Sequence, residues 1–259
     1  MTGRMRAAIV VLALAGAPLW AADLPGIKKA GTLRVLVPGD EIPEMFAFKP
    51  EAVPGFEREI LEGFAALNRI KLDVIPVDRF DDILPSLRKG SGDVVTGIND
   101  TPARRESVDF TVEVLPSRSV VVTRKPHPVV ATVSQFGAEK VGVLKGTSWA
   151  DSAAVAGAHP ESFAEERDVL AALKSGRITA TVLSALEFLL AQRHDPDLQA
   201  GVVLGSPGSA AWAVRKEDRQ LKAALDEYLT NLRRTGSSSR LIVKYFGSDS
   251  LNVLGKQRD

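Results

Sequence analysis

Arg104 follows a helix-start signal and is a candidate for binding an anion. Thr101 is suited to cap the N-terminus of a helix, and Pro102 is suited to its first position. Arg104 then falls in the first turn, beside backbone N–H groups that have no partner within the helix. A guanidinium beside free amides can hold a carboxylate through a bidentate hydrogen bond and extra donors. From spacing alone, a surface arginine paired with Glu106 is the more common case, so both interpretations stay open.

Two further places could contribute to a ligand site. Thr147 and Ser148 follow an apolar stretch and should open a helix, where their hydroxyls would either face a ligand or only cap the helix. Phe80 precedes a helix expected near residues 82–89, and it could stack on a ligand or belong to the core.

Composition and motifs exclude several other functions. The chain of 259 residues carries 33 basic and 32 acidic residues, a balance that argues against a nucleic-acid partner. It has no cysteine, and its three histidines lie far apart, so we expect no metal site. Nucleophile-elbow, phosphate-loop and dinucleotide signatures are missing, so we expect no cofactor.

The elements that must position these residues alternate between strand and helix. Strands are predicted near residues 33–37, 72–75 and 93–98, with helices between them. Such β-α-β order predicts helices packed on a largely parallel sheet. Ligands of such sheets bind beyond the carboxyl ends of the strands.

A second α/β unit follows, and two strands should connect it with the first. Residues 119–125 would leave the first unit, and residues 210–216 would return to it. A helix with apolar residues spaced along 221–232 should then pack on the first unit. We therefore expect lobe 1 to comprise residues 23–120 and 214–259, and lobe 2 to be an insertion of residues 121–213. Two connecting strands permit hinge closure around a ligand.

The N-terminus is typical of a secretory signal peptide over residues 1–22. Arg4 and Arg6 precede a short apolar run that ends in small residues at Ala21 and Ala22. The run is shorter than the roughly 20 residues that span a bilayer. Because there is no cysteine to acylate, we expect a diffusible periplasmic protein. We also expect it to be a monomer.

Short motifs occur in an order that resembles the family 3 periplasmic solute-binding proteins of ABC importers. They lie at residues 31–35, 46–49, 55–57, 80–87, 101–104, 108–111, 141–147, 175–178 and 245–247. The resemblance implies the type II periplasmic binding protein fold, an α/β fold of two lobes joined by two hinge strands. It also implies a non-enzymatic protein that delivers a small carboxylate-bearing solute to an ABC permease in the inner membrane.

The same resemblance implies a set of ligand-binding residues. Arg104 would hold the ligand carboxylate, Phe80 would supply a ring platform, and Asp40 would face a cationic side chain. Assisting groups would come from Gly97, Asn99, Thr147 and Ser148.

At two positions the sequence departs from the family pattern. Ser184 stands where members usually place an aspartate against the ligand α-ammonium, and Pro43 stands where a second stacking ring is usual. Serine cannot neutralise an ammonium, and a buried unpaired charge is costly. Either the ligand lacks an α-amino group, or another acid such as Asp40, Glu41 or Glu187 supplies the countercharge.

Two other functions remain open. The chain resembles exported cyclohexadienyl dehydratases as well, and Glu187 lies three positions after Ser184, where those enzymes place their general acid. A solvated helix glutamate is the simpler reading of Glu187. The other alternative is a periplasmic protein that reports a ligand to a membrane receptor, or an accessory protein whose cleft is vestigial.

Overall fold

A computed structural model describes residues 23–255, so the predicted signal peptide and its cleavage point lie outside the described residues. The strands are β1 Thr32–Pro38, β2 Lys71–Val77, β3 Val94–Asp100, β4 Asp109–Phe110, β5 Leu115–Arg124, β6 Val141–Leu144, β7 Glu161–Phe163, β8 Ala180–Ser184 and β9 Leu198–Val214. The helices are α1 Leu24–Ala30, α2 Phe56–Asn68, α3 Ile83–Arg88, α4 Pro102–Arg105, α5 Val133–Phe136, α6 Ser148–Val155, α7 Glu166–Ser175, α8 Ala185–His194, α9 Arg219–Arg234, α10 Ser237–Phe246 and α11 Asp249–Gly255. A 3-10 turn, η1 Phe80–Asp82, precedes α3.

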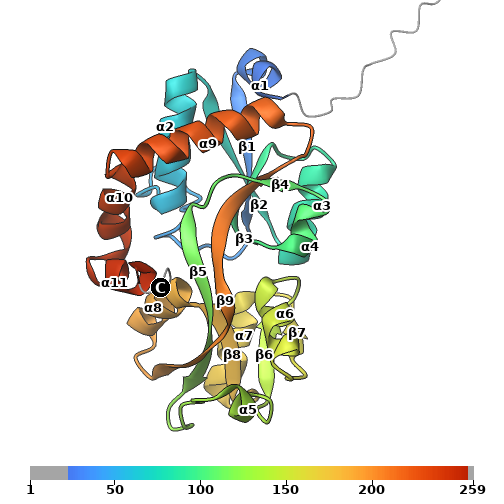
Figure 1. The fold of residues 1–259 in the computed structure, drawn as a ribbon, viewed down its shortest axis with the longest axis vertical. Coiled ribbons are helices and arrows are strands. Elements are labelled where there is room, and N and C mark those ends of the chain that lie inside the picture. The colour runs from blue at the N-terminus through green and yellow to red at the C-terminus, as the bar shows by residue number, and fades with distance from the viewer. Residues whose placement is uncertain (1–22, 256–259) are drawn as a thin grey trace, which may run out of the picture.

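The described strands form one curled sheet in the order β2-β1-β3-β9-β5-β8-β6-β7, with β4 paired to β9. Pairing is parallel within β2-β1-β3 and within β8-β6-β7. Pairing is antiparallel where β9 and β5 join these two groups. Figure 1 shows β5 and β9 running side by side from the upper lobe into the lower one. This α/β arrangement of two lobes joined by two strands confirms the predicted fold class.

The strand β9 is much longer than the sequence pattern predicts. It begins at Leu198 instead of near residue 210, because Gly201, Gly205 and Pro207 interrupt the apolar pattern by which a strand is recognised. Its pairing with β5 shifts register twice between Ser117 and Val122. Such bulges bend and twist a strand pair, which suits a crossing between two lobes.

Each lobe has its own hydrophobic core. Lobe 1 packs α2 and α9 on one face of its strands, with Phe56, Phe64 and Trp212 fully buried. A second cluster, with Ile83 and Leu87 of α3, covers the opposite face of those strands. The core of lobe 2 surrounds β6 and β8 and is centred on residues such as Phe136 and Leu183. The inner parallel strands β1, β3, β6 and β8 are therefore largely buried, as their apolar sequences require, whereas the outer strands β2 and β7 are more exposed.

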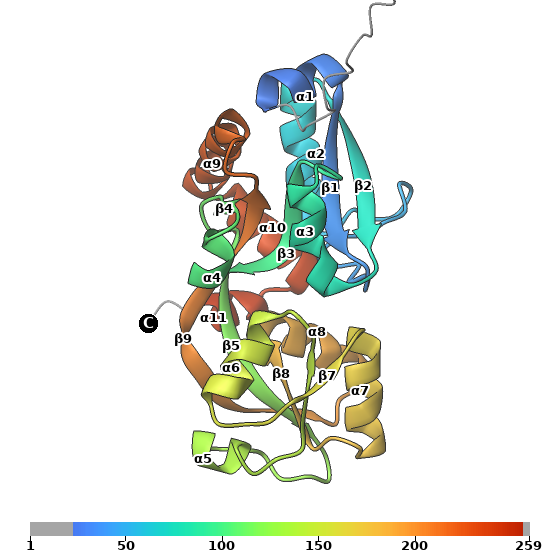
Figure 2. The ribbon, with the colours of Figure 1, turned by 90° about the vertical axis from the view of Figure 1, so that its right-hand side faces the viewer.

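The C-terminal helices reach from lobe 1 to lobe 2. Leu186 and Leu190 of α8 belong to the core cluster that also holds Leu254 of α11. The Arg193 guanidinium donates a hydrogen bond to the Phe246 carbonyl. Figure 2 shows β5 and β9 along one side of the molecule, with α11 close to their crossing. The lobe boundaries at 120/121 and 213/214 stay a prediction.

Candidate ligand-binding site

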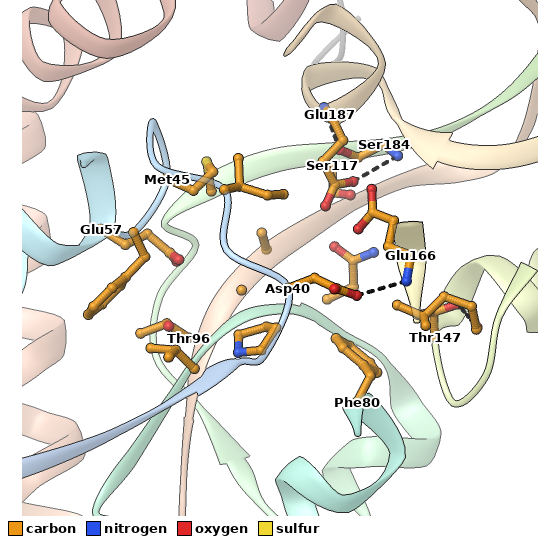
Figure 3. Close-up of a pocket in the computed structure, with 18 of the residues that line it drawn as sticks. Asp40, Met45, Glu57, Phe80, Thr96, Ser117, Thr147, Glu166, Ser184 and Glu187 are labelled. Carbon is orange, nitrogen blue, oxygen red and sulfur yellow. Dashed lines mark hydrogen bonds between the residues drawn. The ribbon is translucent and has the colours of Figure 1, made fainter. Parts of the chain in front are cut away.

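A cavity of about 110 Å³ lies between the lobes, beyond the carboxyl ends of β1 and β3. Lobe 1 contributes residues at the ends of these strands and beyond them, and lobe 2 contributes the starts of α6, α7 and α8. Figure 3 shows this cavity and the carboxyl groups that project into it. The eight predicted site residues all line it: Asp40, Phe80, Gly97, Asn99, Arg104, Thr147, Ser148 and Ser184. Their function in ligand binding remains a prediction.

The local structure around Arg104 is the predicted one. Thr101 caps α4 by accepting a hydrogen bond from the Arg104 backbone N–H at 3.3 Å, and Pro102 occupies the first helical position. The guanidinium lies 5.6 Å from the centre of the Phe80 ring. Its Nη1 donates to the Asn99 carbonyl at 2.7 Å, and its Nη2 donates to the Gly146 carbonyl at 3.0 Å. Arg104 is thus held at the interlobe cavity.

Arg104 has no carboxylate partner among residues 23–255. Its neighbour Arg105, in contrast, forms an ion pair with Asp100 at 2.5 Å outside the cavity. Burial lowers the pKa of the Arg104 guanidinium, and the negative charge of Asp151 opposes this shift. Two of its five N–H groups are bound to backbone carbonyls, so donors remain for an anion. A partly buried cation without a counterion favours an anionic ligand group.

Contacts across the cleft bring the two lobes together. Asn99 Nδ2 donates to Ser148 Oγ at 2.8 Å, and Lys145 Nζ pairs with an Asp81 carboxyl oxygen at 2.9 Å. Gly146, between them, has φ of +79°, and a Cβ there would lie 2.8 Å from Asp81 Cβ. The close approach of the lobes therefore requires glycine at this position.

Thr147 and Ser148 occupy different roles at the start of α6. The buried Thr147 hydroxyl donates to the Leu144 carbonyl at 2.7 Å and accepts from the Ala150 backbone N–H at 3.3 Å. It is therefore the N-cap of the helix. Ser148 is the residue that contacts the other lobe.

Ser184 and Glu187 form a capping box at the start of α8. Ser184 Oγ accepts from the Glu187 backbone N–H at 3.1 Å, and Glu187 Oε2 accepts from the Ser184 backbone N–H at 3.0 Å. Burial raises the pKa of the Glu187 carboxyl, although the bonds to Ser184 oppose the rise. Glu187 thus lines the cavity and is not the solvated helix glutamate of the simpler interpretation.

Glu166 is a cavity residue that the sequence did not identify. Its backbone N–H donates to Asp40 Oδ2 at 2.7 Å, across the cleft. Burial, together with the nearby charges of Glu187 and Asp40, raises the pKa of its carboxyl to about 8. The sequence Glu165-Glu166 resembles any acidic helix start, so no local signal distinguishes the second glutamate from the first.

The far end of the cavity is bounded by another carboxyl group, that of Glu57. Trp212 Nε1 donates to Glu57 Oε1 at 2.9 Å. Burial raises the pKa of Glu57 to about 7, although the hydrogen bonds from Trp212 and the Gly97 backbone oppose the rise. Figure 3 shows Glu57 near Met45 and Thr96, away from Glu166.

Two buried polar groups that line the cavity have no hydrogen-bond partner among the described residues. They are the hydroxyl of Thr96, which is fully buried, and the indole N–H of Trp149. Buried polar groups in proteins are nearly always paired, so these two indicate a site that a polar molecule completes.

Within residues 23–255, no group of three or more His, Asp or Glu side chains could hold a metal ion. In the same part of the chain, no helix is both long and apolar enough to cross a membrane.

Two α/β lobes that enclose a cavity with several charged side chains and are joined by two strands define a solute-binding protein. The chain belongs to the bacterial extracellular solute-binding proteins, family 3, whose sequence model matches residues 33–248.

Solved structures with this fold include amino acid-binding proteins. The holo form of ArgBP from T. maritima is 27% identical, with a TM-score of 0.75 over 86% of this chain and 99% of that one. The ancestral amino acid-binding protein AncCDT-1, described as a precursor of cyclohexadienyl dehydratase, is 25% identical, with a TM-score of 0.76 over 87% of this chain and all of that one.

Curated relatives are enzymes of larger size. The membrane-bound lytic murein transglycosylases F of Stutzerimonas stutzeri (strain A1501) and Pseudomonas putida (strain KT2440) are 28% and 29% identical. In both cases the match covers 90% of this chain and 49% of the relative. The chain therefore spans about half the length of these relatives.

Proposed function

We propose that this protein is the periplasmic solute-binding component of an ABC importer, and that it binds a small carboxylate-bearing, amino acid-like ligand between its lobes. The observation that carries the proposal is the Arg104 guanidinium, which lies at the interlobe cavity without a carboxylate partner among the described residues. The amino acid-binding structures of the same fold support the ligand class.

The geometry suggests how the ligand is held. Its carboxylate accepts hydrogen bonds from the free N–H groups of Arg104, and its body lies against the Phe80 ring. Asn99 and Ser148 bond to each other across the cleft, so ligand binding and lobe closure involve the same residues. Closure removes water from the charged contacts, which strengthens them. The closed form would then be the form that a permease receives.

A thermal-shift panel tests the proposal. It should include the standard amino acids, dicarboxylates and opines, together with native mass spectrometry of the purified protein to detect a co-purified molecule. A ligand present at a hundred times its Kd should add about 2.7 kcal/mol to the free energy of unfolding. If only molecules without a carboxylate stabilise the protein, the proposal is wrong.

A dehydratase remains the second candidate, because Glu187 lines the cavity and its carboxyl pKa is raised. The structural likeness to a dehydratase precursor agrees with it. One oxygen of Glu187 is committed to the Ser184 backbone, however, and this bond explains the residue without catalysis. Incubation with prephenate or arogenate distinguishes the two, since a dehydratase would form phenylpyruvate or phenylalanine and a binding protein would not.

The curated relatives favour a third candidate, a ligand-reporting module. Their names describe membrane-bound enzymes, and this chain spans about half their length. A protein of this kind would close on the same ligand but would pass the signal to a partner instead of a permease. Ligand uptake into cells with and without the gene separates import from reporting.

A further inference from the structure

Two glutamates from different elements of lobe 2 face each other in the cavity. Glu166 opens α7, and Glu187 lies in the first turn of α8. Figure 3 shows the Glu166 side chain directed toward Glu187 and Ser117, away from its own backbone N–H, which is bound to Asp40. The hydrogen bond to Asp40 fixes the start of α7 against lobe 1, so the direction of the Glu166 side chain is set by the contact between lobes.

Neither carboxyl has a cationic partner among residues 23–255. The hydrogen-bond partners of the Glu187 carboxyl belong to Ser184, and the carboxyl of Glu166 accepts no hydrogen bond from the described residues. The other charged or titratable residues that line the cavity are Asp40 after β1, Asp78 after β2, Glu57 of α2 and Arg104 of α4. Arg104 is the one cation in this set, and its bonds go to the Asn99 and Gly146 carbonyls.

Two enclosed carboxyls that face each other cannot both be ionised without a countercharge. Burial and the charges of Glu187 and Asp40 raise the pKa of Glu166 to about 8, so near neutral pH the pair retains a proton. An external cation would replace that proton. The arrangement is therefore either a proton-sharing pair or a receptor for a cation.

We propose that Glu166 and Glu187 together bind the cationic group, an ammonium or a guanidinium, of the same ligand whose carboxylate Arg104 holds. This inference rests on the proposed function and names its ligand more closely, as a zwitterion. The capping box places the Glu187 carboxylate beside the Ser184 backbone. Glu187 therefore supplies an acid next to position 184, where family members usually have an aspartate. Glu166 supplies a second acid from α7.

The rest of the cavity agrees with this assignment. An unpaired cation and an unpaired acidic pair line one enclosed space, and the unpartnered Thr96 hydroxyl and Trp149 indole N–H line it as well. A ligand with both charges satisfies both ends, whereas a 2-oxo acid or a dicarboxylate leaves the acidic pair without a counterion. Binding of the zwitterion near pH 7 should release a proton to solvent.

Titration calorimetry in buffers of different ionisation enthalpy tests the proposal. The probes are the standard L-amino acids and, for each one that binds, the corresponding 2-oxo acid. We expect an amino acid to bind the wild type with release of up to one proton and at least ten-fold more tightly than its 2-oxo acid. The proposal is overturned if the 2-oxo acid binds the wild type as tightly as the amino acid.

The variants are Glu166→Gln and Glu187→Gln, the latter because glutamine retains the capping box. Each should weaken amino acid binding at least ten-fold and should not weaken 2-oxo acid binding. Glu165→Gln is the matched control, since Glu165 precedes Glu166 and does not line the cavity, and it should behave as wild type. Unchanged binding by Glu166→Gln overturns the proposal.

A measurement without ligand separates failure of this inference from failure of the proposed function. If neither these probes nor the dicarboxylates and opines of the thermal-shift panel bind, the proposed function is wrong, and the carboxyl pair is then tested by thermal unfolding between pH 6 and 9. The Tm of the wild type and of Glu165→Gln should fall across this range, because the folded pair must lose its proton, whereas Glu166→Gln should show a smaller fall. If the Tm falls equally in all three proteins, Glu166 does not share a proton with Glu187, and the proposed cation site is wrong.

Discussion

The Asn99 side chain donates a hydrogen bond to Ser148 Oγ at 2.8 Å, and this bond joins the end of β3 in lobe 1 to the start of α6 in lobe 2. The two residues are 49 positions apart in the chain. Both lie beside Arg104 and Gly146, whose hydrogen bond crosses the same cleft. Lobe closure and the candidate anion site therefore depend on one small set of contacts.

Gly146→Ala should oppose closure. The new Cβ would lie 2.8 Å from Asp81 Cβ, and overpacking of this kind costs about 1–3 kcal/mol. Affinity for a stabilising ligand should fall roughly five-fold or more, and small-angle scattering with saturating ligand should show a larger radius of gyration.

Gly157→Ala is the control for this change. Gly157 also has positive φ, at +85°, but nothing lies within 4 Å of a Cβ there. It therefore carries the same kind of backbone strain without the clash between lobes. If Gly157→Ala weakens binding as much as Gly146→Ala, the cleft contact is not the cause.

Ser184→Ala should destabilise the protein by about 1 kcal/mol, because it removes the N-cap of α8. Chemical denaturation measures this loss, and the exposed Ser91→Ala should leave the free energy of unfolding within 0.5 kcal/mol or so of wild type. A full-stability Ser184→Ala protein would show that the capping box does not contribute.

Glu57 should make the protein less stable as pH rises. Burial raises its pKa to about 7 in the folded state, above the value of an exposed glutamate near 4.3, so the folded protein binds the extra proton between these values. The free energy of unfolding should then fall by up to about 1.4 kcal/mol per pH unit from pH 4.5 to 7, and this contribution is lost above pH 7.

Glu57→Gln should flatten this dependence while retaining an oxygen that accepts from Trp212. Tryptophan fluorescence during denaturation at several pH values provides the measurement. Glu62→Gln is the control, because Glu62 lies on the same helix and its side chain, which pairs with Arg58, is exposed. A Glu57→Gln protein with the wild-type slope would contradict the assignment.

Local sequence signals identified the parts of the site that depend on neighbours in the chain. Thr101 and Pro102 predict the start of α4, and Thr147 predicts the start of α6, because caps are formed within a single turn. The buried strand at residues 93–98 corresponds to β3, Val94–Asp100, since a run of apolar residues bounded by turns indicates such a strand.

Features that depend on distant contacts could not be predicted. Glu166 enters the cavity because its backbone binds Asp40, 126 positions away. Most of β9 was missed because glycines and a proline interrupt its pattern, and its pairing with β5 overrides that local preference. The C-terminal helices α10 and α11 were not predicted either. Their apolar residues are buried by contacts with other elements of the fold.

The central claim is that Arg104 holds the ligand carboxylate in the interlobe cavity. The most direct test is calorimetric titration of an amino acid that binds the wild type into Arg104→Ala and Arg105→Ala. Charge-assisted hydrogen bonds contribute about 1.5–3 kcal/mol each, so Arg104→Ala should lose roughly ten-fold or more in affinity. Arg105→Ala, which changes a neighbouring arginine outside the cavity, should bind as wild type does. Equal affinity of Arg104→Ala and the wild type would contradict the account.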